Sequence, residues 1–241
     1  MPLPPALEAI LETRGYLRIA HRGAPSFGID NSDRAILAAL EHQPDLIEID
    51  VHFTSDGQLI LWHDHKIEHA GQQLEISKTS LERLQEVRLS DGSRLVTLEE
   101  AMNMVRGTCG LLVDLKADGL AEAIIECTHK TKLETVVVCG GYFETLRKIK
   151  LLEPRIAVSY TPEFIPFGLN PKVKADFLDA LTVYWRTVTP GFLKASKARG
   201  IQVIAWTVDE PTQMRKLIGM GISGITTNRI EMLAKLELQR R

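Results

Sequence analysis

Short apolar, β-rich runs alternate with helix-like segments along most of the chain. Nine runs have the length and composition of strands, at residues 17–20, 46–51, 59–62, 110–115, 135–139, 155–159, 181–185, 201–206 and 224–227. Helix-like segments separate most of them, at residues 31–43, 98–105, 117–130, 142–152, 190–198 and 210–219. This alternation predicts parallel βαβ units and therefore an α/β fold.

The length of the chain sets the number of domains that we expect. The 241 residues, 44% of them hydrophobic, suffice for one large core, and α/β barrels of this size form single domains. We therefore expect residues 1–241 to form one domain. The nine predicted strands exceed the eight of a closed barrel by one, and the sequence leaves open which one is extra. Residues 66–95 fit no simple barrel unit and combine polar loop with one helix at about residues 80–87.

Two carboxylates stand two residues apart in the run at 46–51. Glu48 and Asp50 therefore point to the same face of a predicted strand. The turn signal Asp56-Gly57 precedes the next run, which leads to His63. A two-residue loop at this turn would place His63 opposite Asp50, with Cβ atoms about 4.5–5.5 Å apart, and a three-residue loop would shift the pairing by one. The pattern predicts two acids and a histidine on one face.

Seven short motifs follow one another in a specific order: His21-Arg22-Gly23, Glu48-x-Asp50-Val51-x-x-Thr54-x-Asp56-Gly57, His63-Asp64, Val96-Thr97-Leu98-Glu99-Glu100, Asp114-Leu115-Lys116, Trp206-Thr207-Val208-Asp209 and Gly224-Ile225-Thr226-Thr227-Asn228. Together they strongly resemble the glycerophosphodiester phosphodiesterase family. Any one of them alone is a weak signal, but the joint pattern is specific and spans His21 to about Arg229.

This resemblance implies a TIM-type (β/α)8 barrel with a small insertion, residues 66–95, that caps the site after the second strand region. Active sites of such barrels lie at the C-terminal ends of the strands. The marked polar and aromatic residues fall at predicted strand ends, which agrees with the resemblance by an independent route: His21, Glu48, Asp50, Asp114, Lys116 and Trp206.

Glu48, Asp50 and Asp114 are the predicted metal ligands. Hard divalent cations such as Mg²⁺ or Ca²⁺ prefer carboxylate oxygens, and clustered acids without a cation repel one another. The alternative is that each acid pairs with a basic neighbour or faces solvent. The family usually has glutamate where Asp114 stands, so this shorter ligand is expected to reach the ion through water or to bind it more weakly.

The same resemblance implies roles for five further residues. His21 and His63 are the candidate general acid and base, because histidine titrates near neutrality. Arg22 and Lys116 are expected to hold the phosphate. Trp206 is expected to form a wall of the alcohol pocket. The alternatives are structural histidines, surface salt bridges and ordinary core packing.

Three segments depart from the family pattern. Asp30-Asn31 stands in place of Pro-Glu-Asn, Glu68-His69-Ala70 in place of Arg-Thr-Thr, and Gly140-Gly141 in place of Ser-Phe. His52, His65 and His69 lie off the motifs, and we interpret them as structural. Because these departures surround the substrate, we expect them to affect specificity more than reaction type.

The resemblance implies metal-dependent hydrolysis of a glycerophosphodiester to sn-glycerol 3-phosphate and an alcohol. Direct attack by water and a cyclic phosphate intermediate both remain open. One alternative is a lysophospholipase D-type enzyme, which an apolar groove in residues 66–95 or around Phe164–Phe167 would favour. Another is a barrel that binds phosphodiesters without turnover.

Charge and composition narrow the possible partners. A net charge of −2 with scattered basic residues does not favour nucleic acid. Three cysteines form neither a disulfide framework nor a metal-binding pattern. The N-terminus lacks the features of a signal peptide, and no apolar run approaches the roughly 18 residues of a membrane span. We expect a cytoplasmic enzyme acting on a small molecule. The oligomeric state cannot be read from the sequence.

Overall fold

Eight parallel strands close into a barrel in the part of the chain that the computed structural model describes, residues 3–162 and 175–238. They are β1 (Leu17–Ala20), β2 (Leu46–Phe53), β6 (Gly110–Leu115), β7 (Val136–Gly140), β8 (Ala157–Tyr160), β9 (Ala180–Tyr184), β10 (Gln202–Trp206) and β11 (Gly224–Thr227). Strand β1 pairs in parallel with both β11 and β2, and this closes the ring. The predicted TIM-type (β/α)8 barrel is confirmed.

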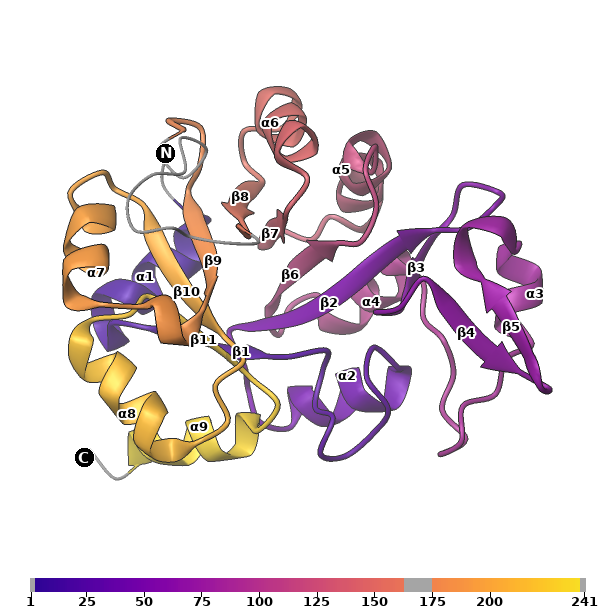
Figure 1. The fold of residues 1–241 in the computed structure, drawn as a ribbon, viewed down its shortest axis with the longest axis horizontal. Coiled ribbons are helices and arrows are strands. Elements are labelled where there is room, and N and C mark those ends of the chain that lie inside the picture. The colour runs from indigo at the N-terminus through magenta and orange to yellow at the C-terminus, as the bar shows by residue number, and fades with distance from the viewer. Residues whose placement is uncertain (1–2, 163–174, 239–241) are drawn as a thin grey trace.

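Helices lie outside the ring of strands (Figure 1). They are α2 (Asp33–Leu40), α4 (Leu98–Val105), α5 (Ala121–Thr131), α6 (Phe143–Leu152), α7 (Pro190–Lys197), α8 (Pro211–Met220) and α9 (Ile230–Leu238). The six predicted helices are confirmed, with ends that differ by a few residues. Within the described ranges, no helix has the length and hydropathy needed to cross a bilayer. The segment around Phe164–Phe167, where an apolar groove would favour the lysophospholipase D alternative, lies outside the described residues.

The strand in excess of eight is β3 (Leu59–Leu61), which pairs antiparallel with β2. The register predicted for a two-residue loop is wrong by one. Val51 pairs with Leu61, and the Trp62 amide donates to the carbonyl of Asp50 at 3.1 Å. His63 therefore lies one residue beyond the position opposite Asp50.

A three-residue loop, residues 55–57, causes this shift. Gly57 has a φ of 74°, and such a left-handed residue after a turn is typical of three-residue hairpin loops. The Thr54 amide donates to the carbonyl of Gln58 at 2.9 Å, which closes the loop. The Thr54 hydroxyl accepts from the Gln58 amide at 2.9 Å and donates to Asp56 at 2.5 Å. These side-chain bonds to residues inside the turn stabilise the longer loop.

The segment after β3 forms a small unit beside the barrel (Figure 1). It consists of the hairpin β4 (Lys66–His69) and β5 (Gln72–Glu75), the 3₁₀ turn η1 (Ile76–Lys78) and helix α3 (Leu81–Gln85). Its apolar side chains form a separate core with β3: Ile60, Ile67, Ile76, Leu84, Val87, Leu89 and Leu95. The predicted helix at about 80–87 corresponds to α3. The hairpin was not predicted, because its strands are short and mostly exposed.

The barrel interior divides into two halves. In the N-terminal half, here called the apolar half, one cluster fills the interior: Leu17, Ile19, Leu46, Leu112, Val137, Ala157, Ala180 and Ile204. Helix α1 (Pro5–Arg14), which was not predicted, packs Leu7 against this cluster. The C-terminal half, here called the polar half, contains charged and hydroxyl side chains: Glu48, Asp50, Asp114, Ser159, Thr182 and Thr226.

Candidate active site

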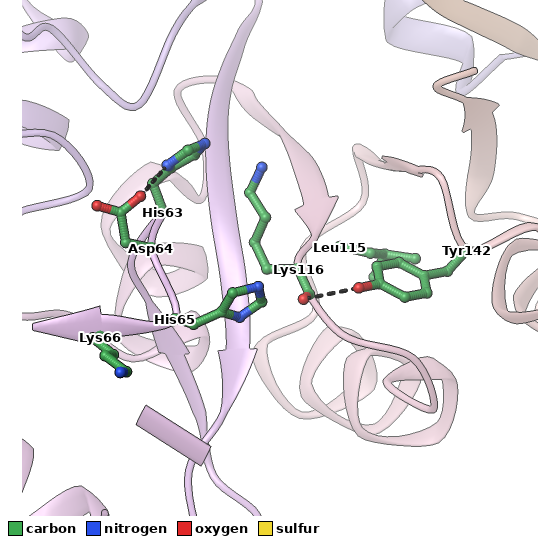
Figure 2. Close-up of a pocket in the computed structure, with 7 residues that line it drawn as sticks. All are labelled: His63, Asp64, His65, Lys66, Leu115, Lys116 and Tyr142. Carbon is green, nitrogen blue, oxygen red and sulfur yellow. Dashed lines mark hydrogen bonds and ion pairs between the residues drawn. The ribbon is translucent and has the colours of Figure 1, made fainter. Parts of the chain in front are cut away.

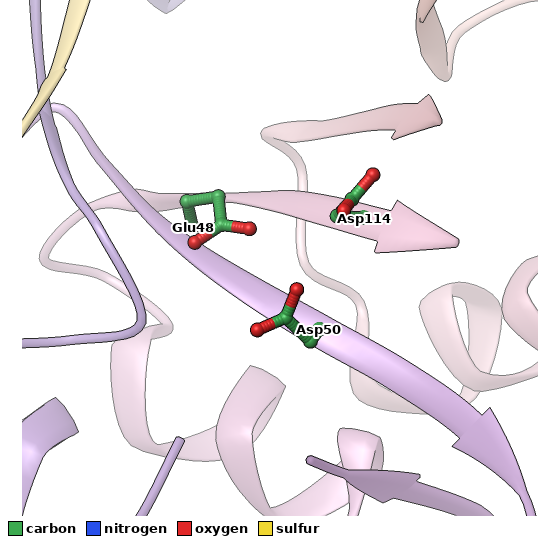
Figure 3. A group of neighbouring side chains, drawn as sticks. All are labelled: Glu48, Asp50 and Asp114. Atoms are coloured by element: carbon green, nitrogen blue, oxygen red, sulfur yellow. The ribbon is translucent and has the colours of Figure 1, made fainter. Parts of the chain in front are cut away.

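Three carboxylates meet in the polar half of the barrel. Glu48 and Asp50 extend from the same face of β2, and Asp114 lies directly beside Asp50 on the neighbouring strand β6 (Figure 3). Each residue offers an oxygen within 4.8 Å of those of the other two. A compact set of carboxylate oxygens is the donor set that hard divalent cations prefer. The residues present therefore fit a divalent metal ion.

The electrostatics of the three acids are unequal. Burial raises the pKa of Glu48 well above its usual range, and the charges of Asp50 and Asp114 raise it further. Burial also raises the pKa of Asp114 and outweighs the opposing effect of Lys116. Burial acts in the same direction on Asp50, but Lys116 and Arg22 outweigh it, so that the pKa of Asp50 is lowered. Glu48 is the least compensated charge, and a bound cation would stabilise its ionised form.

Two basic side chains border the acids. Lys116 Nζ lies 2.9 Å from Asp50 Oδ1 and 2.6 Å from Asp114 Oδ2. Arg22 Nε lies 3.0 Å from Asp50 Oδ2, and its backbone amide donates to Glu48 Oε2 at 2.9 Å. Asp50 and Asp114 thus pair with basic neighbours. Such pairing was the alternative to metal binding in the sequence analysis.

A left-handed turn places Arg22 beside the acids. Arg22 has a φ of 53° and Gly23 a φ of 87°. A Cβ atom at Gly23 would lie 2.7 Å from the backbone carbon of Ala35, so only glycine fits there. The glycine of the His21-Arg22-Gly23 motif is therefore required by the packing of this turn against helix α2.

The altered segment Asp30-Asn31 contacts the same residues. Asn31 is fully buried, donates to Asp50 Oδ2 at 2.8 Å and accepts from the Asp50 amide at 3.0 Å. Asp30 accepts from Arg22 Nη1 at 3.0 Å. From the sequence, this altered pair was expected to affect specificity more than reaction type. The structure shows that Asn31 orients Asp50 and that Asp30 positions Arg22.

The two candidate histidines differ in environment. His21 Nδ1 lies 2.6 Å from Asn228 Oδ1, and Asn228 Nδ2 donates to Asp209 at 2.8 Å. Because Oδ1 can only accept, Nδ1 carries the proton, and Nε2, 3.8 Å from Glu48 Oε2, is left without one in the neutral ring. Burial lowers the pKa of His21, which favours this neutral form. His63 is more exposed and pairs with Asp64 at 2.7 Å.

All eight predicted site residues line one cavity of about 240 Å³. A second, more open cavity of about 550 Å³ adjoins it and shares His63 and Lys116 (Figure 2). Its other lining residues include His65, Lys66 and Tyr142, and the Tyr142 hydroxyl donates to the carbonyl of Lys116 at 3.1 Å. The shift in hairpin register therefore does not remove His63 from the acids.

Two supporting contacts were missed from the sequence. His52 lies two residues after Asp50 on β2, and its Nε2 is 3.3 Å from the carbonyl of His63. The two-residue spacing after Asp50 was the available signal. The second contact is the link from His21 through Asn228 to Asp209. Both partners stood in motifs of the sequence, but nothing in their spacing indicated that link.

Comparison with known proteins agrees with this site. The model of the glycerophosphoryl diester phosphodiesterase family matches residues 21–232. The chain therefore belongs to this family, whose members hydrolyse glycerophosphodiesters and depend on a metal, and it is a phosphoric diester hydrolase. A glycerophosphodiester phosphodiesterase of Caldanaerobacter subterraneus is 26% identical, over 91% of this chain and 97% of the relative.

Solved structures with the same fold include two of particular interest. A glycerophosphodiester phosphodiesterase from Parabacteroides distasonis has a TM-score of 0.81 and 27% identity, over 94% of this chain and 98% of the other. A phosphodiesterase from Oleispira antarctica in complex with the product sn-glycerol-3-phosphate has a TM-score of 0.80 and 22% identity, over 91% and 96%. The second likeness shows the fold alone.

Proposed function

We propose that the cavity of about 240 Å³ is the catalytic centre and that Glu48, Asp50 and Asp114 hold a divalent cation, Mg²⁺ or Ca²⁺. The observation that carries this proposal is the meeting of three carboxylates, two histidines and two basic side chains in one cavity. When bound, such a cation polarises phosphoryl oxygens and stabilises developing charge. The products are sn-glycerol 3-phosphate and an alcohol.

His21 and His63 share the two proton transfers. One ring removes the proton of the attacking hydroxyl group, and the other delivers a proton to the leaving alkoxide. The contact of His21 Nδ1 with Asn228 supports this, because it leaves Nε2 able to accept a proton on the side of Glu48. His63, at the junction of the two cavities, is accessible to both the substrate and solvent.

Arg22 and Lys116 bind the phosphate, and Trp206 forms a wall for the alcohol. Both basic groups line the cavity and are held in place by Asp30, Asp50 and Asp114 rather than projecting freely into solvent. Trp206 ends β10 and remains 36% exposed at the cavity, so one part of its ring system is free for a ligand.

Release of glycerol 3-phosphate tests the function directly. The protein should hydrolyse several glycerophosphodiesters, lose this activity after EDTA and dialysis, and regain it with Mg²⁺ or Ca²⁺. A lysophospholipid in the same assay tests the lysophospholipase D alternative. Full turnover in excess EDTA would exclude the metal, and tight substrate binding without turnover under any metal would support a barrel that only binds phosphodiesters.

Asp114 tests the ligand set. Its carboxylate contacts Lys116 at 2.6 Å and the Cys139 thiol at 3.5 Å. Asp114→Ala should weaken metal binding, and Asp114→Glu should retain or tighten it, because cation–oxygen distances of about 2.0–2.6 Å leave little tolerance for a missing methylene. Isothermal titration with Mg²⁺ and Ca²⁺ distinguishes the readings: equal affinity in all three proteins would remove Asp114 from the site.

We further propose that residues 1–241 act as one barrel domain in which residues 66–95 cap the site. The position of Lys66 on the second cavity, which shares His63 with the first, supports this. We also propose that the protein works in the cytoplasm on small-molecule phosphodiesters and does not bind nucleic acid. The three free thiols are compatible with a reducing compartment, and cell fractionation tests that location.

A further inference from the structure

One hydroxyl group in the polar half stands out because it has no partner. Thr226 on β11 is 1% exposed, and its Oγ1 atom is buried without a hydrogen-bond partner among the described residues. The residue lines the same cavity as the three acids. Thr161, directly after β8, lines this cavity too, and its Oγ1 is likewise buried and unpaired within the described ranges.

Two neighbouring hydroxyl groups, those of Thr182 and Thr227, have hydrogen-bond partners. Thr182 lines the same cavity, and its Oγ1 lies 2.6 Å from Ser159 Oγ. Thr227, the next residue after Thr226, donates to Asp209 at 3.0 Å. Most buried polar side chains in proteins are paired, and an unpaired one is unfavourable for folding unless a ligand or water completes it. The unpaired hydroxyls thus mark positions where the cavity itself must supply the partner.

We propose that Thr226, assisted by Thr161, forms a hydrogen-bonding subsite for the hydroxyl groups of the glycerol half of the substrate. This inference rests on the proposed function. A threonine hydroxyl is uncharged and both donates and accepts, which matches an alcohol group. The phosphate is matched instead by the charged groups of Arg22 and Lys116, which line the same cavity.

The relative size of the two cavities supports the glycerol half as the occupant. The cavity with Thr226 measures about 240 Å³ and is enclosed by the barrel, whereas the adjoining cavity measures about 550 Å³ and is more open. An alcohol that differs between substrates needs open space, which the exposed Trp206 and the adjoining cavity provide. The part common to all glycerophosphodiesters therefore fits inside the barrel, where a fixed hydroxyl can recognise it.

The test compares two substitutions at one position. Thr226→Val removes the hydroxyl and keeps the shape, and Thr226→Ser keeps the hydroxyl. The control is Thr182→Val, which removes a hydroxyl of the same cavity that already has a partner. Each protein is assayed on a glycerophosphodiester and on the propyl phosphodiester of the same alcohol, which lacks both glycerol hydroxyls. Thermal unfolding is measured in parallel.

Thr226→Val should lower kcat/KM for the glycerol substrate by about 3–10-fold, the value of one neutral hydrogen bond, and leave the propyl substrate unchanged. Its melting temperature should be equal to or above that of the parent, since an unpaired hydroxyl is lost. Thr226→Ser should behave as the parent. Thr182→Val should lower the melting temperature without discriminating between the substrates.

Two results would overturn the proposal. If Thr226→Val has the same kcat/KM as the parent on both substrates, the hydroxyl does not contact the substrate. If kcat/KM falls by the same factor on both substrates, the substitution acts through packing and not through a hydrogen bond to glycerol. Calorimetric binding of sn-glycerol 3-phosphate and propyl phosphate to the same variants gives the answer without turnover. A parent protein that binds but does not cleave would contradict the proposed function, while the difference in binding still decides the role of Thr226.

Discussion

The two halves of the barrel interior differ although the same strands build both. On β2, Leu46 and Glu48 both point inward and are two residues apart. Leu46 is fully buried in the apolar half, together with Leu7 of helix α1. Glu48 is 6% exposed in the polar half, where burial and its neighbours raise its pKa. Two successive inward-facing residues of one strand therefore differ in their effect: burial of Leu46 stabilises the fold, whereas burial of the ionised Glu48 destabilises it.

This contrast shows where the molecule places its stability and its chemistry. The apolar half gains free energy by removing large side chains from water. The polar half brings three acids together. Arg22 and Lys116 compensate Asp50 and Asp114, but the buried charge of Glu48 stays unfavourable without a cation. The stability gained in the apolar half offsets the cost of burying charges in the polar half. Because these charges lie at the C-terminal ends of the strands, a ligand can reach them.

Among the substitutions in the polar half, Glu48→Gln should reduce activity most. Loss of one carboxylate of the proposed metal site should lower kcat/KM by about 10³-fold or more, since metal-ion stabilisation of charge contributes several kcal/mol and each 1.36 kcal/mol is tenfold in rate. The fold should persist with equal or higher stability, because a buried charge is removed. Steady-state kinetics and thermal melts measure both; near-normal activity would exclude Glu48 from the site.

Substitutions of the two histidines should have the next largest effect on the rate. His21→Gln and His63→Gln should each lower the rate by about 10²–10⁴-fold, the usual contribution of a general acid or base. Asn228→Ala should have a smaller effect than His21→Gln, because it removes only the group that orients the His21 ring. The three rates are compared at one pH and saturating metal. If both histidine variants remain fully active, the acid–base assignment is wrong.

Leu46→Ala tests the apolar half and should give the opposite pattern. Truncation of a fully buried leucine leaves a cavity and should lower the free energy of unfolding by about 2–5 kcal/mol. The turnover number per folded molecule should stay unchanged. Urea unfolding and active-site titration separate the two quantities. A large fall in turnover without loss of stability would show that the two halves are coupled.

The smallest expected effect is a dependence of stability on pH. The pKa of Glu48 is raised above its ordinary value of 4.5, so that the folded state binds the proton more tightly than the unfolded state. Without a divalent cation, the stability from this group is present below pH 4.5 and is lost as the pH rises toward the raised pKa, by about 1.4 kcal/mol for each unit of difference. Asp50, with a lowered pKa, acts in the opposite direction below its ordinary value of 3.8.

Melting curves at several pH values, with and without Mg²⁺ or Ca²⁺, measure this effect. A bound cation should reduce the loss at higher pH, and Glu48→Gln should abolish the part that depends on Glu48. An identical decline in the parent and in Glu48→Gln would assign it to other groups. The stability of Leu46→Ala should be lower at every pH but show the same slope as the parent.

Much of this architecture was determined locally along the chain. The alternation of apolar runs and helical segments predicted the strands of the barrel, because burial on both faces selects continuous apolar sequence. Helix α4 (Leu98–Val105) was predicted at its observed bounds, and its capping box of Thr97 and Glu100 is complete within four residues of sequence. The two-residue spacing of Glu48 and Asp50 placed both acids on one face without any knowledge of the fold.

Tertiary structure decided what depended on distant partners. The register of the β2–β3 hairpin is a choice between two turn lengths that the Asp56-Gly57 signal alone does not distinguish. The observed loop has partners outside the hairpin: the Ser55 amide donates to the carbonyl of Thr79, and Asp56 accepts from the Leu81 amide. Helix α1 is stabilised by covering one end of the barrel, so its own sequence predicted little. Asn228 meets His21 only because ring closure places β11 beside β1. Sequence thus determined which residue types face inward, and only closure of the barrel decided which of them touch.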